Sequence, residues 1–172
     1  MNNAAIDTDW GPMGLGWTER GLARLSLPGP RLADVLSRWG HRGTPPAALG
    51  PLIEAILAYV AGAQVEFDTF ELDLEAVPAF HRAVYADMRS LRWGQTTTYG
   101  AIARRIGEPL AARAVGQAMR ANPMPLVIPC HRVMGANGRS GGFSAPGGVS
   151  TKMKMLAIEQ ASAPNGQLAF GF

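Results

Sequence analysis

The only cysteine of the chain, Cys130, is followed directly by a histidine and an arginine, His131 and Arg132. A thiolate is a strong protein nucleophile, and basic or cationic neighbours favour its formation. A lone cysteine is more often a small buried packing residue without chemistry. Pro129 and the two basic neighbours are unusual around a packing residue. The pattern therefore predicts that Cys130 is a reactive thiol with a lowered pKa.

The segment before the cysteine must position it. Leu126-Val127-Ile128 lies between Pro125 and Pro129. A short apolar run bounded by prolines is typical of a buried, near-extended segment. We therefore expect Cys130 to be presented by a rigid part of the core and not by a loose loop.

The bulk composition limits the class of protein. At 172 residues, with 47% hydrophobic and 17% charged residues, the chain has the profile of a soluble globular protein with one large or two small domains. One cysteine excludes an internal disulfide and favours a reducing compartment, so we expect a cytoplasmic protein. No signal peptide is recognisable, and no apolar run approaches the roughly 18 residues of a membrane span. We therefore expect no membrane association.

Charge divides the chain into two parts. Residues 1–76 contain five Arg and ten Asp or Glu, a net charge of −5, whereas residues 77–172 contain nine Arg, two Lys and three Asp or Glu, a net charge of +8. A basic, arginine-rich half indicates a polyanionic partner, and a solvated basic face without a partner is the alternative. We expect an acidic supporting domain over 1–76 and a basic, polyanion-binding domain over 77–172.

The acidic half has an α/β pattern without visible chemistry. Apolar segments at 13–17 and 22–27, separated by a glycine-containing turn, predict strands, and the alternation over 65–74 predicts another. Helices are predicted at 31–39 and at 49–60. These elements would form a small sheet with helices that supports the rest of the chain.

The basic half is predicted to be mostly helical. Helical spacing of apolar residues predicts helices over 78–91 and 150–158. Between them, a short helix over 101–106, a turn containing Gly107 and a second helix over 110–121 form the pattern of a helix-turn-helix.

Two further features of the basic half concern a partner or ligand. The second helix of the helix-turn-helix carries Arg113 and Arg120 with small residues between them, which allows close approach to a partner or close helix packing. The glycine-rich stretch over 135–148 is expected to be a flap or a backbone-lined pocket wall.

Two long motifs in the basic half resemble those of the O6-alkylguanine-DNA alkyltransferase family. Its members are the suicidal methylated-DNA–protein-cysteine methyltransferases of direct DNA repair. Pro129-Cys130-His131-Arg132-Val133 is the same as the family's active-site motif, and residues 113–123 match its recognition-helix block. The resemblance is good from about residue 77 onward and only general before it. It implies that 77–172 is the DNA-binding and alkyl-accepting domain and that 1–76 supports it.

The resemblance implies a role for each matching residue. Cys130 would accept the alkyl group, and His131, acting through a water molecule and oriented by Glu159, would be its base. Asn122 would hold the turn that places the thiol. Tyr99 would contact a DNA phosphate and donate a proton to the leaving guanine.

The resemblance also implies how DNA is held. Arg113 would fill the gap in the base stack when the damaged nucleotide is rotated out of the duplex, with its helix in the minor groove. Further DNA contacts are expected from Thr98, Ala114 and Arg120. The substrate pocket is expected to include Pro125, Val133, Ala145, Pro146 and Gly147.

Two departures from the family pattern are visible. Many members have a tyrosine in the pocket flap where this chain has Ala145, which bears on the size of the alkyl group accepted. Some members bind zinc through cysteines of the N-terminal domain, and this chain has no cysteine there. We expect no metal, no cofactor, and a monomer that binds double-stranded DNA containing O6-alkylguanine.

Other functions were weighed against this one. Non-catalytic lesion-binding relatives flip damaged bases but lack the cysteine, so Cys130 argues against that class. A thiol hydrolase with Cys130, His131 and Glu159 would be unusual, because catalytic Cys and His normally come from distant segments. A transcription regulator would need a dimer helix for operator binding, and none is obvious.

Overall fold

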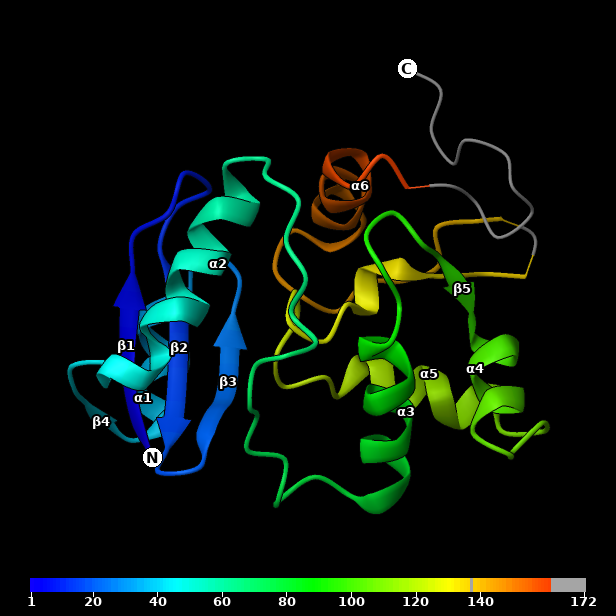
Figure 1. The fold of residues 1–172 in the computed structure, drawn as a ribbon, viewed down its shortest axis with the longest axis horizontal. Coiled ribbons are helices and arrows are strands. Elements are labelled where there is room, and N and C mark those ends of the chain that lie inside the picture. The colour runs from blue at the N-terminus through cyan, green and yellow to red at the C-terminus, as the bar shows by residue number, and fades with distance from the viewer. Residues whose placement is uncertain (137, 162–172) are drawn as a thin grey trace. The chain divides into compact units, whose positions relative to one another are not determined.

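The computed structural model describes residues 1–136 and 138–161, and its fold is shown in Figure 1. These residues form two compact units. The first contains Met1–Ala76 and Pro123–Pro125, and the second contains Val77–Asn122 and the described residues from Leu126 onward. The first unit is a mixed sheet with helices and the second is mostly helical, which confirms the predicted fold class.

The first unit is built on a four-stranded sheet in the order β3-β2-β1-β4. β2 pairs antiparallel with β1 and with β3, and β4 pairs parallel with β1. The strands β2 and β3 were predicted, but β1 and β4 were not. Neither has the run of β-branched and aromatic residues that marks a strand in sequence. The bounds are β1 (Asn2–Ile6), β2 (Met13–Thr18), β3 (Gly21–Ser26) and β4 (His41–Arg42).

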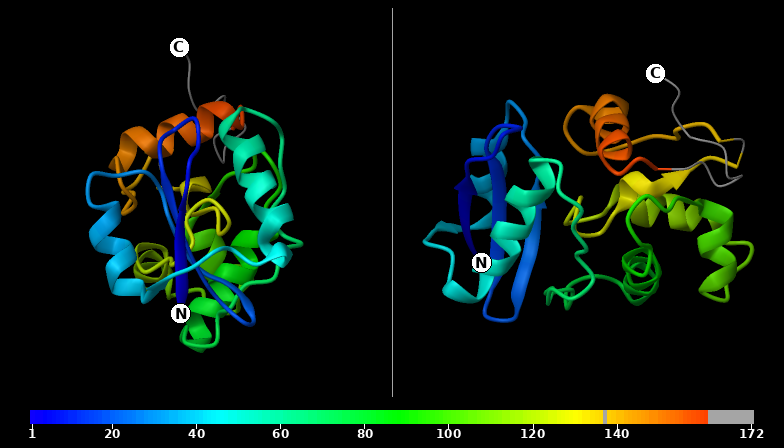
Figure 2. Two further views of the ribbon diagram at one scale, coloured as in Figure 1. Left: turned by 90° about the vertical axis from the view of Figure 1, so that its left-hand side faces the viewer. Right: turned by 45° about the horizontal axis from the view of Figure 1, so that its top comes forward.

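Helices α1 (Leu32–Trp39) and α2 (Gly50–Val60) cover opposite faces of this sheet (Figure 2). Both helices were predicted, and the 3-10 turn η1 (Ala47–Leu49) leads into the second. The central strand β2 is consequently buried on both faces. A Cβ at Gly14 would lie 2.9 Å from the Leu32 side chain and 3.0 Å from that of Leu36, so the glycine lets α1 pack closely on the strand.

The predicted strand over 65–74 is wrong, because that stretch is a loop fixed at two points. Phe67 packs on Tyr59 with ring centroids 5.9 Å apart, and Leu72 makes a single bridge to Leu22. The apolar alternation breaks between Phe67 and Phe70, so the apolar side chains do not keep to one face of a strand.

The second unit consists of helices around a short parallel ladder. β5 (Thr97–Thr98) pairs with β6 (Val133–Met134), and α4 begins directly after β5. All four helices were predicted, with ends that differ by a few residues. No helix in the described part of the chain is long and apolar enough to cross a membrane. The helices are α3 (Ala79–Arg89), α4 (Tyr99–Arg105), α5 (Ala112–Arg120) and α6 (Gly148–Ile158).

The segment before Cys130 is buried as predicted but is not near-extended. Leu126, Val127 and Ile128 are 1% exposed or less, yet Leu126 has φ = +81° and begins a turn. The side chain of Asn122 donates a 2.8 Å hydrogen bond to the carbonyl of Ile128. Six extended residues would separate those two positions by about 20 Å, so closing this bond requires the chain to turn.

Candidate active site

Cys130 is the first residue of the 3-10 turn η2 (Cys130–Arg132) and lines a cavity of about 820 Å³ in the second unit. That volume lies within the range of small-molecule sites. Cys130 is only 8% exposed. The other wall residues come from the start of α4, from α5 with the residue that follows it, and from the glycine-rich flap; they are Tyr99, Arg113, Gly116, Gln117, Met119, Arg120, Ala121, Gly142, Phe143 and Ser144.

Asn122 holds the turn that carries the thiol. Its Nδ2 donates to the carbonyl of Ile128 at 2.8 Å, and its side chain also hydrogen-bonds the Cys130 thiol. The backbone N–H of Cys130 donates to the same Ile128 carbonyl at 2.7 Å. These contacts link Asn122 to both ends of the turn, and its part in the reaction stays a prediction.

His131 and Glu159 form a buried pair behind the cysteine. The His131 Nε2 lies 2.7 Å from the Glu159 Oε1, and their side chains are 1% and 0% exposed. Burial alone would raise the pKa of Glu159. The hydrogen bonds from His131 and Arg132, the charge of Arg132 and, in acid, the charge of protonated His131 outweigh burial and lower this pKa to about 2. Glu159 is thus ionised at neutral pH and can only accept hydrogen bonds.

This pairing assigns the tautomer of His131. Because Glu159 only accepts, the imidazole proton must lie on Nε2, which leaves Nδ1 with a free lone pair. Burial lowers the pKa of His131, so the ring is neutral at pH 7. The Nδ1 atom is buried and has no hydrogen-bond partner among the described residues. His131 can therefore act as a base through Nδ1.

Arg132 serves the carboxylate and not the thiol. Its Nε donates to the Glu159 Oε2 at 2.8 Å, its Nη2 to Oε1 at 3.2 Å, and its Nη1 to the Leu91 carbonyl at 2.7 Å. The guanidinium is 4% exposed and fixes the position of Glu159. Sequence reasoning assigned Arg132 no such role, because the two partners are distant in sequence.

The expected low pKa of the Cys130 thiol is wrong for the free protein. Burial raises this pKa to about 11, against lowering effects from Asn122, from the charge of Lys152 and from backbone N–H groups. A thiolate loses most of its hydration in such a position, which explains the direction of the shift. The nearby cation that acts on the sulfur is Lys152 and not Arg132.

Sequence reasoning missed Lys152. Its side chain is fully buried, its Nζ donates to the Val133 carbonyl, and burial lowers its pKa to about 8. The signal that could have found it is helical spacing. Lys152 lies three and four residues before Met155 and Leu156, which are both fully buried on the same helix face.

The hydroxyl of Tyr99 and the ammonium of Lys152 both lie beside Gly141 of the flap. A Cβ on Gly141 would be 3.3 Å from the Tyr99 hydroxyl and 3.8 Å from the Lys152 Nζ. Burial, with a smaller contribution from Cys130, raises the pKa of Tyr99, so its phenol keeps its proton at neutral pH. A nucleophile, a neutral proton donor and a cation thus occupy one small region.

Only some of the other residues expected to contact DNA lie together at the cavity. Arg113 and Arg120 line the cavity with Tyr99 and Cys130. The Thr98 Oγ1 caps α4 by accepting from the Ala101 N–H at 3.2 Å. Ala114 is on α5 but not in the cavity wall.

The predicted pocket residues are absent from the cavity wall. Val133 is buried in β6, Pro125 belongs to the first unit, and the other three follow the wall residue Ser144 along the flap. Their contact with a substrate stays a prediction. These residues are Pro125, Val133, Ala145, Pro146 and Gly147.

The flap does supply an aromatic ring, contrary to what Ala145 suggested. Phe143 lines the cavity, so the position that matters lies two residues earlier. Phe143 has no hydroxyl, which distinguishes it from the tyrosine that the resemblance implied for many members. No cluster of three or more His, Cys, Asp or Glu that could bind a metal occurs within 1–136 and 138–161.

Comparison with known sequences gives consistent matches. Residues 79–161 match the family model described as 6-O-methylguanine DNA methyltransferase, DNA binding domain. The methylated-DNA–protein-cysteine methyltransferase of Mycolicibacterium paratuberculosis is 36% identical over 163 residues, which cover 95% of this chain and 81% of that protein. The Mycobacterium tuberculosis protein of the same name is 37% identical over 160 residues, covering 92% of each.

Solved structures show the same fold. The crystal structure of Mycobacterium tuberculosis O6-methylguanine methyltransferase matches with a TM-score of 0.78 at 34% identity, covering 95% of this chain and 94% of that one. That of Mycobacterium tuberculosis OGT in complex with DNA matches with a TM-score of 0.74 at 31% identity, covering 99% and 100%. This chain therefore belongs to the methylated-DNA–protein-cysteine methyltransferase family, whose members are DNA repair methyltransferases with a DNA-binding domain.

Proposed function

We propose that this chain repairs DNA directly by transferring the alkyl group of an O6-alkylguanine in duplex DNA to its own Cys130, once per molecule. One observation carries the proposal: the only cysteine lines a cavity that Tyr99 and Arg113 also line. Family membership supports the reaction class.

Activation of the thiol is the first requirement. A thiol with a pKa of about 11 is almost entirely protonated at pH 7, and ionising it costs roughly 5 kcal/mol. The free Nδ1 of His131 receives this proton through a bridging water molecule, as the family resemblance implies. Glu159 accepts from Nε2, stabilises the imidazolium that forms, and keeps the ring oriented.

The transfer itself is a displacement at carbon. The Cys130 sulfur forms a bond to the alkyl carbon while the bond from that carbon to the guanine O6 breaks, and the electron pair stays with the base. The neutral Tyr99 phenol donates a proton to the leaving guanine. The product thioether has no leaving group, so the thiol is not regenerated and each molecule acts once.

Access to the lesion requires a rotated nucleotide. A base inside the duplex is out of reach of a thiol that lines a cavity, and turning it out costs a few kcal/mol. Arg113 is exposed on α5 at the cavity wall, so it can occupy the vacated space in the base stack. Thr98, Ala114 and Arg120 lie on the same two helices or their caps and contact the DNA nearby.

The decisive experiment uses duplex DNA carrying radiolabelled O6-methylguanine. Label should move to the protein with a stoichiometry of at most one, and the mass of the protein should rise by about 14 Da, one CH2, on the peptide containing Cys130. Cys130→Ala should bind the duplex without accepting label.

Three outcomes would refute the proposal. Tight binding of the lesion with an unreacted thiol would indicate a non-catalytic lesion-binding protein. Many turnovers per molecule would indicate an ordinary enzyme. Label on another residue would leave Cys130 without its role.

A further inference from the structure

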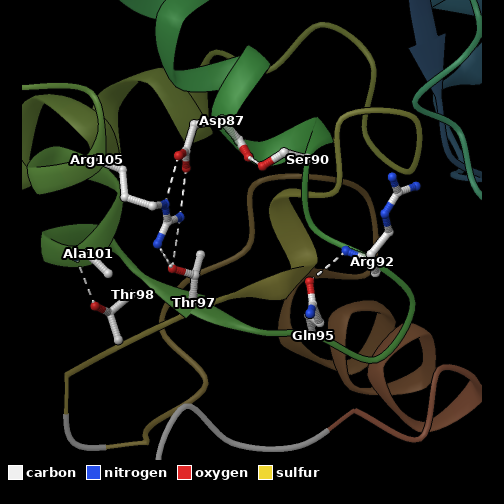
Figure 3. A network of polar contacts seen from close by, with 8 residues as sticks. All are labelled: Asp87, Ser90, Arg92, Gln95, Thr97, Thr98, Ala101 and Arg105. Carbon is white, nitrogen blue, oxygen red and sulfur yellow. Dashed lines mark hydrogen bonds and ion pairs between the residues drawn. The ribbon is translucent and has the colours of Figure 1, made fainter.

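A cluster of polar contacts lies next to the segment that carries Tyr99. Arg105, the last residue of α4, binds Asp87 of α3 through two parallel bonds, from Nε to Oδ1 and from Nη2 to Oδ2, each 2.7 Å long. The same guanidinium contacts Thr97 of β5, since Nη1 and Nη2 both lie 3.2 Å from its Oγ1 (Figure 3). One side chain therefore joins three elements.

Thr97 connects the contacts of Arg105 to the backbone that leads into Tyr99. It is 4% exposed, and it pairs with Val133 in the two-residue ladder of β5 and β6. The next residue, Thr98, caps α4 through the Ala101 N–H, and Tyr99 begins the helix. The backbone just before Tyr99 is thus linked through Arg105 to Asp87 of α3 and to the last residue of α4.

The ladder connects this backbone to the nucleophile. β6 follows η2 without an intervening residue, so the strand that pairs with Thr97 starts directly after the turn that begins with Cys130. The Tyr99 ring lies 3.9 Å from the place where a Cβ on Gly116 would be, and its hydroxyl is packed beside Gly141. In such a packed position, displacement of the backbone moves the hydroxyl relative to the sulfur.

We infer that Arg105 is a positioning residue for alkyl transfer, which with Asp87 holds Thr97 and so places the Tyr99 hydroxyl relative to Cys130. The inference rests on the proposed function. The Asp87 side chain is 11% exposed and that of Arg105 is 43% exposed. A bidentate pair with this exposure can also contribute to stability, so thermal melts must show that each variant is folded under the conditions of the assay.

Single-turnover kinetics with the O6-methylguanine duplex provide the test. Arg105→Ala should lower the first-order transfer constant at saturating DNA about tenfold, because misplacement of a reacting group by a fraction of an ångström costs rate. The DNA concentration for half-saturation should change less than about twofold, since Arg105 does not line the cavity. Arg105→Lys keeps the charge without the planar fork and should recover only part of the rate.

A double-mutant cycle with Tyr99→Phe identifies the route of the effect. If Arg105 acts through the Tyr99 hydroxyl, Arg105→Ala should slow the Tyr99→Phe protein less than about twofold. Asp87→Asn keeps the shape of the ion-pair partner but removes its charge. As a single substitution it should lower the transfer constant about as much as Arg105→Lys does.

The matched control is Arg20→Ala in the first unit. Arg20 also forms an ion pair, with Asp73 and Glu75, but it belongs to the other unit, so its loss should leave the transfer constant unchanged. The inference is overturned if the transfer constant is unchanged in Arg105→Ala and Arg105→Lys. It is also overturned if Arg105→Ala lowers the transfer constant of the Tyr99→Phe protein by the same factor as that of wild type. If wild-type protein transfers no label, the proposed function itself fails, and the inference fails with it.

Discussion

Glu159→Gln is the most informative single substitution, because one buried carboxylate serves two neighbours. Glu159 accepts two hydrogen bonds from Arg132 and one from His131, and its side chain is fully buried. Glutamine keeps the shape but replaces one acceptor oxygen by an NH2 group. A donor then faces a donor at His131 or at Arg132, and the guanidinium is left as a buried cation without a counter-charge.

Two routes give a similar magnitude for this loss. Removing one partner of a buried ion pair costs about 3–5 kcal/mol. The pKa of Glu159, about 2 against 4.5 for the ordinary group, corresponds to about 3 kcal/mol of folding free energy at neutral pH. A loss of that size lowers the thermal midpoint by roughly 6–20 °C in a protein of this length.

The pH dependence has a defined sign. Because the folded-state pKa of Glu159 is depressed, its contribution to stability is complete above about pH 4.5 and is lost as the pH falls towards 2. Wild-type protein should therefore lose stability through that window, and Glu159→Gln should lose correspondingly less. Circular dichroism melts at several pH values measure both effects.

The control for this substitution is Glu54→Gln, which changes an exposed carboxylate on α2. It should alter the free energy of unfolding by less than about 0.5 kcal/mol. The reasoning about the shared carboxylate is refuted if Glu159→Gln melts within about 2 °C of wild type and shows the same pH profile.

Three further substitutions probe the same site. Lys152→Met removes the cation that lowers the Cys130 pKa, so single-turnover transfer should slow at least about tenfold at pH 7. The difference in transfer rate between wild type and Lys152→Met should become smaller above pH 8, because the Lys152 ammonium, with a pKa of about 8, loses its proton there. Asn122→Ala removes a hydrogen bond to the thiol and should slow transfer roughly 10–100-fold, equivalent to about 1.5–3 kcal/mol, with little change in DNA affinity by gel shift. Gly141→Ala places a Cβ near the Tyr99 hydroxyl, at a residue with a positive φ of 64°. It should therefore lower the free energy of unfolding by about 1 kcal/mol in denaturant titrations, and it should also slow transfer. A normal transfer rate would contradict the packing of Tyr99 against Gly141.

Much of the second unit could be predicted from sequence because its signals are local. Apolar residues at helical spacing predicted α3 and α6, and the turn around Gly107 separated α4 from α5. The turn that carries the thiol was marked by Pro129-Cys130-His131 itself. Local patterns of this kind are visible in any window of a few residues.

The parts that failed depend on partners distant in sequence. β4 is a strand of two residues that exists only through its pairing with β1. The loop over 65–74 alternates only in two short pieces, which are out of phase between Phe67 and Phe70, and it makes one bridge, to Leu22. Whether Arg132 faces the thiol or Glu159 is decided by how α6 packs, and no local pattern encodes that. The burial of Lys152 was missed although its helical spacing to Met155 and Leu156 is a local signal.

The low exposure of Cys130 has a consequence for the lifetime of the protein. Under the proposed function each molecule reacts once, so a molecule whose sulfur reacts first with an oxidant or a small electrophile is lost. With 8% exposure and a pKa of about 11, only about one thiol in ten thousand is ionised at pH 7, so iodoacetamide should label the native protein far more slowly than it labels glutathione. The same desolvation that makes ionisation costly thus preserves the unreacted form during storage, until a substrate held in the cavity meets the sulfur at high effective concentration.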